Sequence, residues 1–300
     1  MKKQNDKVLL TVFTPAYNRA HTLGRTYESL CAQSCKNFLW LIVDDGSTDS
    51  TASLVKEWQQ QENGFEIRYV YKENGGMHTA HNTAYELIDT ELNTCIDSDD
   101  AMGEDAVRLI CEKWAGVRDM GYAGIIGLDA DFSGKIIGKG FPEGLTETTV
   151  IGYYQTGGSG DKKLVYRTDI IQKCPPYPVF EGEKYYSLAY KYRLIDQKYK
   201  MAVLDAVLCN VEYQADGSSF NMIRQYARNP KGFAHWRRFS MELPMSRKRL
   251  FEVCTHYVSS SILAGDHDFF RKSPKKAMTA AALLPGFLLS CYVKLKTEQK

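Results

Sequence analysis

The chain has 300 residues, of which 44% are hydrophobic and 25% are charged. This composition is typical of a globular protein and excludes a disordered chain, and the length allows one or two domains with a sizeable core. The formal net charge of +2 at pH 7 conceals an acidic region that is followed by a basic one.

The basic region begins near Asn221. From there onward the chain carries 15 Lys and Arg against 5 Asp and Glu, whereas residues 1–220 carry 23 against 31. Such a segment typically faces nucleic acid, phosphorylated ligands or an anionic membrane surface. Eight scattered cysteines without a CxxC pair argue against a zinc site or a disulfide framework. The polar N-terminus MKKQNDK precedes only a short apolar run, so we expect no secretory signal and a cytosolic location.

The first 115 residues alternate between short apolar runs and amphipathic segments. Strands are predicted over 8–13, 39–43, 65–71 and 92–96, and helices around 23–30, 54–58, 80–88 and 104–114. Four such alternations predict an α/β fold with a Rossmann-like, mostly parallel sheet. Neither GxGxxG nor GxxxxGK[ST] occurs, so a dinucleotide fingerprint and a P-loop are both unsupported.

The next hundred residues contain shorter predicted strands. These are expected over 122–127, 134–140 (a hairpin arm), 164–168, 201–205 and 207–213. Residues 174–183 are expected to form an extended loop because three prolines block a helix there. A helix is predicted over 184–197, with Glu183 at or near its first turn.

Carboxylates follow two of the predicted strands. Asp44 and Asp45 end one apolar run, and Asp97, Asp99 and Asp100 end another. Ligands of open α/β sheets bind beyond the carboxyl ends of the strands, so both groups are expected at one edge. Crowded carboxylates raise one another's pKa and favour a bound cation, such as Mg²⁺ shared with phosphates. The alternative is a helix N-terminus that is capped by aspartates.

Four segments together resemble the motifs of the inverting family 2 glycosyltransferases, which have the glycosyltransferase A-type fold. They are TPAYN at 14–18, DDGSTD at 44–49, ENGGMHTAHN at 73–82 and DSDD at 97–100, in that order. The resemblance covers about residues 8–215. It implies a catalytic domain over 1–220, with a nucleotide-sugar-binding half at 1–115 and an acceptor-binding half at 116–220. Residues 221–300 would then be a helical basic C-terminal extension.

The resemblance also implies roles for individual residues in nucleotide binding. The loop around Tyr17 would pack on the base, and Asp45 would accept a hydrogen bond from a base N–H, which suits uracil. Asp97 and Asp99 would lie toward the ribose, and Asp99 and Asp100 would hold Mn²⁺ or Mg²⁺. The full set of expected nucleotide contacts is Thr14, Pro15, Tyr17, Arg19, Asp44, Asp45, His78, Asn82, Asp97 and Asp99. Tyr213 and Asp216 match a segment that closes over the donor in relatives.

The expected catalytic base is Glu183, with Glu181 as the alternative. Inversion needs a carboxylate to deprotonate the acceptor hydroxyl. Many family members have a Glu-Asp pair where this chain has EGEK, so both residues stay candidates. The structural alternative for either residue is a loop acid or a helix cap.

The resemblance implies a metal-dependent hexosyl- or N-acetylhexosaminyltransferase of the EC 2.4 class. The expected donor is a UDP-sugar and the expected acceptor an oligosaccharide or a lipid-linked saccharide in bacterial surface-polysaccharide synthesis, at the inner face of the membrane. A competing hypothesis is a nucleotide- or nucleic-acid-binding protein that uses the basic region. The acidic first 220 residues argue against nucleic acid.

The apolar run at 277–293 bears on the membrane contact. Its 17 residues are bracketed by lysines and include Pro285 and Gly286. The run is shorter than the roughly 20 residues that span a bilayer, so we expect it to lie in the membrane interface. The alternative is a helical hairpin that packs on the protein itself.

Overall fold

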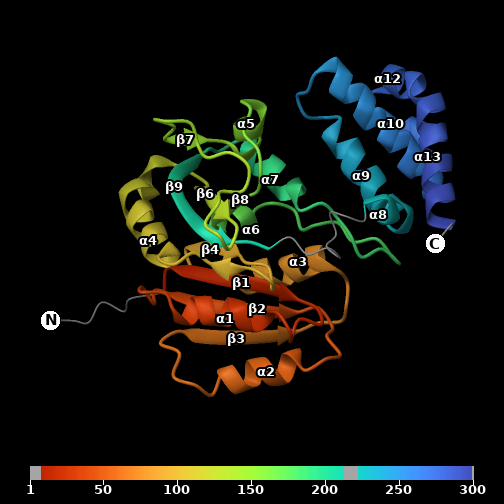
Figure 1. The fold of residues 1–300 in the computed structure, drawn as a ribbon. Helices are drawn as coiled ribbons and strands as arrows, with labels where there is room; N and C mark the ends of the chain where they lie inside the picture. The colour runs from red at the N-terminus through yellow and green to blue at the C-terminus, as the bar shows by residue number, and fades with distance from the viewer. Residues whose placement is uncertain (1–7, 213–221, 299–300) are drawn as a thin grey trace. The chain divides into compact units, whose positions relative to one another are not determined.

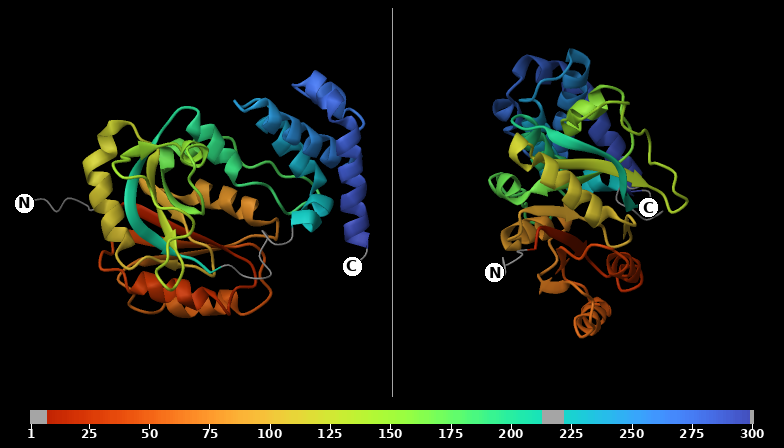
Figure 2. Two further views of the ribbon diagram at one scale, coloured as in Figure 1. Left: turned by 45° about the horizontal axis from the view of Figure 1, so that its top comes forward. Right: turned by 90° about the vertical axis from the view of Figure 1, so that its left-hand side faces the viewer.

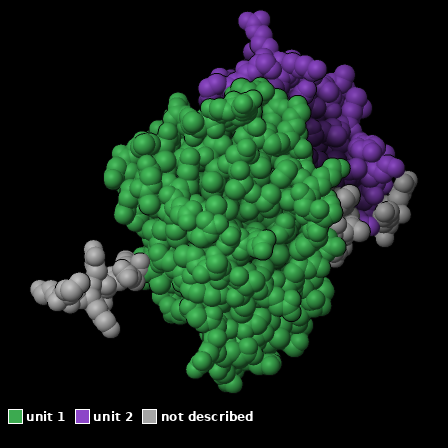
Figure 3. Space-filling model, turned by 60° about the vertical axis from the view of Figure 1, so that its left-hand side comes forward, with its two compact units in different colours: residues 1–176, 191–212 green, residues 177–190, 213–300 purple. Residues whose placement is uncertain are grey.

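The computed structural model describes residues 8–212 and 222–298, and the chain divides into two compact units. Unit 1 is Met1–Pro176 with Lys191–Glu212, and unit 2 is Tyr177–Tyr190 with Tyr213–Lys300 (Figure 3). The sequence placed the boundary between the two parts at residue 220. In the structure, residues 177–190 also belong to the second unit.

A mixed β-sheet forms the centre of unit 1 (Figure 1). Its strand order is β3-β2-β1-β4-β8-β6-β9-β5, with β7 paired to β9. β1 is parallel to β2 and β4, and β2 is parallel to β3, whereas β8 runs antiparallel to β4 and β6. The strands are β1 (Leu10–Ala16), β2 (Phe38–Asp44), β3 (Glu66–Tyr71), β4 (Leu92–Cys95), β5 (Ala101–Met102), β6 (Gly124–Ala130), β7 (Glu147–Thr148), β8 (Lys162–Arg167) and β9 (Met201–Asn210). The predicted mostly parallel sheet is confirmed in the first half of the unit.

Helices cover both faces of this sheet because alternate side chains of the strands are apolar on both sides. Leu10 and Val12 of β1 enter the core with residues of α1, α2 and α4, whereas Phe13 faces α3 and contacts the ring of His81 with centroids 5.0 Å apart. Figures 1 and 2 show α1 and α2 alongside the β1–β3 part of the sheet. The helices are α1 (Leu23–Cys31), α2 (Thr51–Trp58), α3 (Met77–Leu87), α4 (Ala106–Val117), α5 (Val150–Gln155), α6 (Thr168–Gln172) and α7 (Ala189–Asp196).

Two predictions in the second half of the unit were wrong, and a third holds only in part. The two strands predicted at 201–205 and 207–213 form one strand, β9, which runs to Asn210. The predicted hairpin arm at 134–140 turns back antiparallel to the end of β6, but it makes a single bridge, between Ala130 and Ile136, after a turn held by Asp131. The helix predicted over 184–197 begins only at Ala189, and the backbone N–H groups of residues 184 and 185 donate to the Asn229 side chain. β5, which pairs with β9, was not predicted.

Unit 2 is helical. Its helices are α8 (Met222–Arg228), α9 (Pro230–Ser240), α10 (Arg247–Leu263), α11 (Phe269–Lys272), α12 (Lys276–Ala281) and α13 (Leu283–Glu298). α10 packs against α9, α12 and α13, with Tyr257 and Val258 in the core. Pro285 lies in the first turn of α13, where proline is tolerated, so the helix continues through Gly286. Among the helices described here, none is both long and apolar enough to cross a membrane.

Candidate functional site

The carboxyl ends of four parallel strands meet at one edge of the sheet. The register pairs Ala16 with Asp44, Asp44 with Tyr71, and Phe13 with Cys95. The segments that follow these strands therefore emerge side by side. They carry nearly all of the predicted nucleotide and metal residues, so this edge is the candidate site.

The segments after β1 and β2 are bound to each other. Asn18, in a left-handed conformation with φ 53°, receives a hydrogen bond at Oδ1 from the backbone N–H of Thr48 (2.8 Å). The backbone N–H of Asn18 donates to Ser47 Oγ (2.8 Å), and that of Ala20 donates to Asp49 Oδ2 (3.1 Å). These contacts fix the loop that presents Tyr17.

Tyr17 is the member of the predicted base-binding loop that is open to a ligand. Its side chain is 49% exposed, whereas Thr14 and Pro15 are buried in β1. Thr14 Oγ1 accepts a hydrogen bond from Trp40 Nε1 at 2.9 Å. The predicted base contacts of this loop stay predictions, and Tyr17 is the side chain that is accessible for them.

Asp45 fixes the loop between β3 and α3. Its Oδ1 lies 2.5 Å from Lys72 Nζ and 3.0 Å from the backbone N of Gly75, and its Oδ2 lies 2.7 Å from the backbone N of Gly76. The neighbouring Asp44 is buried and accepts from Ser47 N and Tyr69 Oη. The structure thus shows a loop-anchoring role for both aspartates, and their predicted contacts with a nucleotide stay predictions.

His78 lies at the start of α3, behind this loop. Its side chain is buried, and burial lowers its pKa to about 4, with Asp45 opposing that shift and Lys72 adding to it. The imidazole is therefore neutral at pH 7, so it is suited to a hydrogen bond with a phosphate rather than to an ion pair. Asn82, one turn further along α3, is half-buried.

The acidic segment after β4 surrounds a lysine from β8. Lys163 Nζ donates to the backbone oxygen of Cys95 at 3.1 Å. Asp100 is buried, and the Cys209 thiol lies 4.0 Å from its Oδ2. Asp129 of β6 is also buried, and its Oδ1 has no hydrogen-bond partner. The structure thus gathers several carboxylates near the ammonium group of one half-buried lysine.

Burial and mutual repulsion raise the pKa values of these carboxylates. Burial raises the pKa of Asp100 to about 7, with Lys163 opposing the shift and Asp97 and Asp99 adding to it. Burial likewise raises the pKa of Asp129 to about 6, again against Lys163. Asp97 is exposed on one side, but loss of water on its other side raises its pKa. The positive charges of Lys163 and Arg19 oppose that shift. A cation bound here would hold these groups in the charged form.

The donor groups fit a hard divalent cation that is shared with a ligand. Within residues 8–212 and 222–298, no cluster of three or more His, Cys, Asp or Glu side chains is arranged to hold a metal by itself. Mg²⁺ is usually held by one or two carboxylates together with phosphates and water, and Asp99 and Asp100 offer that number. The predicted metal role of these residues stays a prediction.

Glu183, the predicted base, caps a helix of unit 2. Its Oε1 accepts from the backbone N of Lys231 and its Oε2 from that of Gly232, each at 2.7 Å. These are N–H groups of the first turn of α9, which its own N-cap residue leaves without a side-chain bond. Glu183 is buried and Glu181 is exposed. The prediction that Glu183 opens the following helix was wrong, and Tyr213 and Asp216 lie outside the described residues.

The sequence analysis missed two lysines at this edge. Lys72 follows β3 and pairs with Asp45, and Lys163 stands in β8 beside the acidic segment. No clear sequence signal marked Lys163, because the strand expected over 164–168 did not include it and three of the six residues of β8 are basic. Its acidic neighbours depend on strand order, which the sequence does not state.

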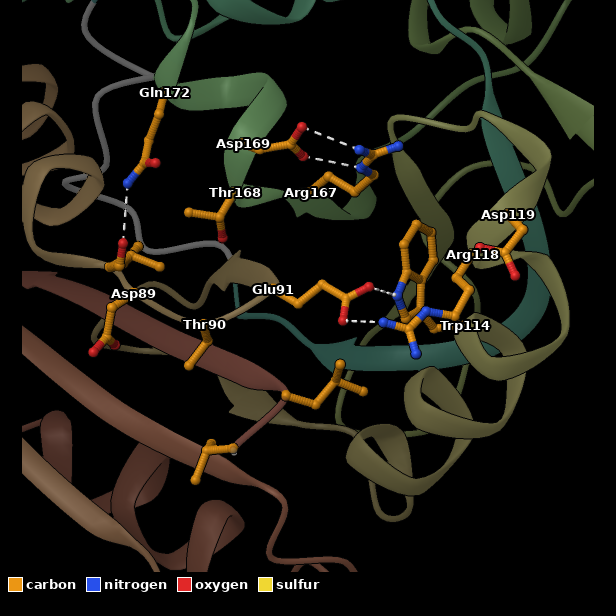
Figure 4. A pocket seen from close by; sticks show the side chains of 13 residues that line it. Asp89, Thr90, Glu91, Trp114, Arg118, Asp119, Arg167, Thr168, Asp169 and Gln172 are labelled. Atoms are coloured by element: carbon orange, nitrogen blue, oxygen red, sulfur yellow. Dashed lines mark hydrogen bonds and ion pairs between the residues drawn. The ribbon is translucent and has the colours of Figure 1, made fainter. Parts of the chain in front are cut away.

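A hollow lies at the opposite edge of the sheet from the candidate site (Figure 4). It measures about 600 Å³ and is lined by residues that precede β1 and β4. Its charged side chains bind one another: Glu91 accepts from Trp114 Nε1 and Arg118 Nη2, and Arg167 pairs with Asp169. No predicted site residue lines it.

Sequence comparisons relate the first part of the chain to known proteins. The model for Glycosyl transferase family 2 matches residues 11–133. Glycosyltransferase GlyA of Streptococcus pneumoniae is 33% identical over 109 residues, which are 36% of this chain and 15% of that protein. The putative teichuronic acid biosynthesis glycosyltransferase TuaG of Bacillus subtilis is 33% identical over 101 residues, 34% of this chain and 40% of that one. The alignments thus span less than half the length of either relative.

Two solved structures share the fold over nearly the whole chain. Residues 1–349 of S. aureus TarS in complex with UDP-GlcNAc align with a TM-score of 0.62 at 15% identity, covering 97% of this chain and 92% of that one. Mannosyltransferase PcManGT from Pyrobaculum calidifontis, in complex with GDP-Man and Mn²⁺, aligns with a TM-score of 0.55 at 15% identity, covering 94% and 87%. The fold is therefore the glycosyltransferase A type.

Proposed function

We propose that the chain is a family 2 glycosyltransferase, and more closely an inverting, metal-dependent hexosyl- or N-acetylhexosaminyltransferase, because residues 11–133 match the model of that family. Its donor is a UDP-sugar. Support for the donor class comes from the TarS complex with UDP-GlcNAc, and support for the metal comes from the PcManGT complex with Mn²⁺.

One observation carries this proposal. The acidic segment Asp97–Asp100 lies within the family-matched residues, at the sheet edge where Tyr17 is exposed and the half-buried Lys163 is the counter-charge. An exposed aromatic ring suits a nucleotide base. Carboxylates with raised pKa suit a cation that is shared with a diphosphate. A nucleoside diphosphate sugar has both of these parts.

In the proposed reaction the chain binds the donor and removes one proton. Tyr17 would stack on the base, and Asp99 and Asp100 would hold Mn²⁺ or Mg²⁺. The ion would stabilise the negative charge of the leaving UDP. Glu183, or else Glu181, takes the proton from the acceptor hydroxyl while its oxygen attacks the anomeric carbon opposite the leaving group. Each Glu183 oxygen accepts one backbone bond and has a further lone pair for that proton.

The acceptor is proposed to be a growing surface saccharide, oligomeric or lipid-linked, at the inner face of the cell membrane. The similarity to a teichuronic acid biosynthesis protein supports the polysaccharide class. The excess of Lys and Arg after Asn221 supports a location beside anionic lipid.

The test is UDP release by the purified protein across a panel of UDP-sugars, with Mn²⁺ or with EDTA. We expect release with Mn²⁺ from at least one donor and little with EDTA. Asp100→Ala should lower that release by about a thousandfold, because it removes charge stabilisation of the leaving group. Absence of release from every UDP-sugar, with and without metal, would contradict the proposal.

The base is identified by a matched pair of variants. Glu183→Gln should leave UDP binding intact and lower transfer by about 10²–10⁴-fold, as expected for the loss of a general base. Glu181→Gln should keep most of the transfer activity. The opposite result would move the base to Glu181. Thermal unfolding of both variants is needed, since Glu183 also caps α9.

A further inference from the structure

Within unit 2, helix α13 packs against its neighbours through the side of the helix that carries its smaller residues. Ala282, just before the helix, Ser290 and Val293 are buried, and Gly286 lies against α10. A Cβ added at Gly286 would approach Val258 Cβ to 2.6 Å, so the two helices are in close contact there. α13 runs beside α10 in both Figure 1 and Figure 2.

The large apolar side chains of α13 point the other way. Leu284 is 69% exposed, Leu288 58% and Leu295 59%, with Phe287 and Tyr292 about half exposed. These positions recur at spacings of three and four, so they form one continuous stripe along the helix. A helix of a soluble protein normally buries such a stripe and exposes its small and polar residues. α13 has the inverse arrangement.

Lysines flank this stripe. Lys294 lies seven residues after Phe287, and Lys296 lies four residues after Tyr292. Because of these spacings, one lysine lies along each side of the stripe, on either side of Leu295. Both are exposed. Between residues 269 and 297 the chain contains six Lys and Arg and no Asp or Glu. The long stems of lysines can lie along apolar surface while their ammonium groups stay in water.

These features favour one occupant. A second copy of the chain would bring lysine borders against lysine borders, which is electrostatically unfavourable. Helix α13 has 16 residues that reach about 24 Å, which is less than the thickness of the hydrocarbon core. An anionic bilayer surface provides apolar depth for the leucines and negative headgroups for the lysines.

We propose that the exposed face of α13, formed by Leu284, Phe287, Leu288, Tyr292 and Leu295 and bordered by Lys294 and Lys296, docks the protein on an anionic lipid surface. The helix lies in the plane of the interface with its leucines below the headgroups. This inference deepens the proposed function. It rests on that function only for which membrane the helix would meet, the inner face of the cell membrane. Vesicle binding is measured without donor or acceptor, so the two ideas fail separately.

The test is co-sedimentation of the full chain with lipid vesicles. Vesicles of phosphatidylcholine with about 30% phosphatidylglycerol are compared with pure phosphatidylcholine at about 0.05 M and 0.5 M salt. We expect partitioning about tenfold stronger on the anionic vesicles at low salt. The double variant Leu284→Ser/Leu288→Ser should lower it by at least about tenfold. Lys294→Gln/Lys296→Gln should remove the preference for anionic lipid.

Met120→Ser/Val179→Ser is the matched control, because both side chains are exposed apolar residues outside α13. This control should bind vesicles like the parent chain, and circular dichroism should show that every variant is folded. Unchanged binding of Leu284→Ser/Leu288→Ser, or no binding of the parent chain to anionic vesicles, would overturn the proposal. A dimer in sedimentation velocity that this variant converts to a monomer would also overturn it, because a second copy would then cover the face.

Discussion

At the scale of single residues, the charge of the site depends on Lys163. Its ammonium group is the cation that most strongly opposes the raised pKa values of Asp97, Asp100 and Asp129. Burial disfavours the charged lysine, but Cys209 and the three aspartates outweigh that effect and raise its pKa. Lys163 and the carboxylates therefore stabilise each other's charged forms. The proposed metal ion would add further positive charge beside the same carboxylates.

We predict that Lys163→Met destabilises the metal-free protein by about 3 kcal/mol, because it leaves buried carboxylates without their counter-charge. Affinity for UDP should fall by at least about tenfold. Urea unfolding and calorimetric titration measure the two effects. Lys163→Arg, which keeps the charge, should retain most of the stability, and equal stability of Lys163→Met and the parent would contradict this role.

The pKa of Asp100, raised to about 7, predicts a pH dependence of stability. The folded state holds a proton on this group between about pH 4 and pH 7, where the unfolded chain has released it. Folding stability of the metal-free protein should therefore fall as the pH rises through this range and reach its low value above about pH 7.

Asp100→Asn should remove part of that fall and should stabilise the metal-free protein at pH 8 by about 1–3 kcal/mol. Urea unfolding at pH 5 and pH 8 in EDTA measures it, with exposed Asp205→Asn as the charge-matched control. Addition of Mn²⁺ at pH 8 should stabilise the parent and not Asp100→Asn. A parent chain that is equally stable at both pH values would contradict the assignment.

At the scale of elements, the loop between β3 and α3 is held in place by a side chain that follows another strand, β2. Asp45, after β2, binds Lys72 and the backbone N–H groups of Gly75 and Gly76. The contact is close, because a Cβ at Gly46 would approach Asn74 N to 2.7 Å. The first turn of α3, where His78 lies, is thus positioned by β2.

We predict that Asp45→Asn loosens this loop and lowers the free energy of unfolding by about 2–3 kcal/mol, since an amide cannot replace both the ion pair and the charged acceptor. Hydrogen exchange should become faster at residues 72–79. Glu73→Gln, an exposed change in the same loop, is the control and should leave that exchange unaltered. Protection that is unchanged in Asp45→Asn would show that the loop does not depend on this carboxylate.

The contact of α13 with α10 gives a second prediction at this scale. Gly286→Ala would place a Cβ within 2.6 Å of Val258 Cβ, and it should lower the stability of unit 2 by about 1–3 kcal/mol. Gly116→Ala, in α4, meets nothing within 4 Å and should instead raise stability by about 0.5–1 kcal/mol. Thermal unfolding of the two variants checks the opposite signs, and a gain in both would mean that the helices can move apart at no cost.

At the scale of the whole molecule, the second unit is built from two separate stretches of chain. Residues 177–190 depend on α9: Glu183 caps it, Tyr186 Oη lies 2.9 Å from His235 Nδ1, and Tyr190 packs on Phe239. A chain cut at the sequence boundary of residue 220 would lose all of these partners.

We predict that a chain ending at residue 220 keeps the sheet but exposes residues 177–190. Trypsin should then cleave rapidly at Lys184, and a dye that binds apolar surface should report the uncovered tyrosines. The full chain under the same conditions is the control. Equal protection of Lys184 in both chains would show that α9 is not needed to order this segment.

Sequence patterns determined the first half of the fold better than the second. The apolar runs that became β1 to β4 end in carboxylates, and a parallel sheet brings such ends together without further information. β5 has two residues and pairs with β9 more than a hundred positions later, so no local pattern marks it. For the same reason the bonds from Glu183 to α9 and from Lys163 to Cys95 were missed, since their partners lie 48 and 68 residues away.

The discontinuous course of unit 2 has a consequence for synthesis on the ribosome. Residues 177–190 emerge while the sheet is still incomplete, since β9 follows them, and α9 appears some 40 residues later. During that interval three tyrosines of this stretch, Tyr185, Tyr186 and Tyr190, lack the helix that they contact in the finished protein. The nascent chain is therefore most vulnerable to chaperone capture or misassociation between the translation of Tyr190 and that of Ser240.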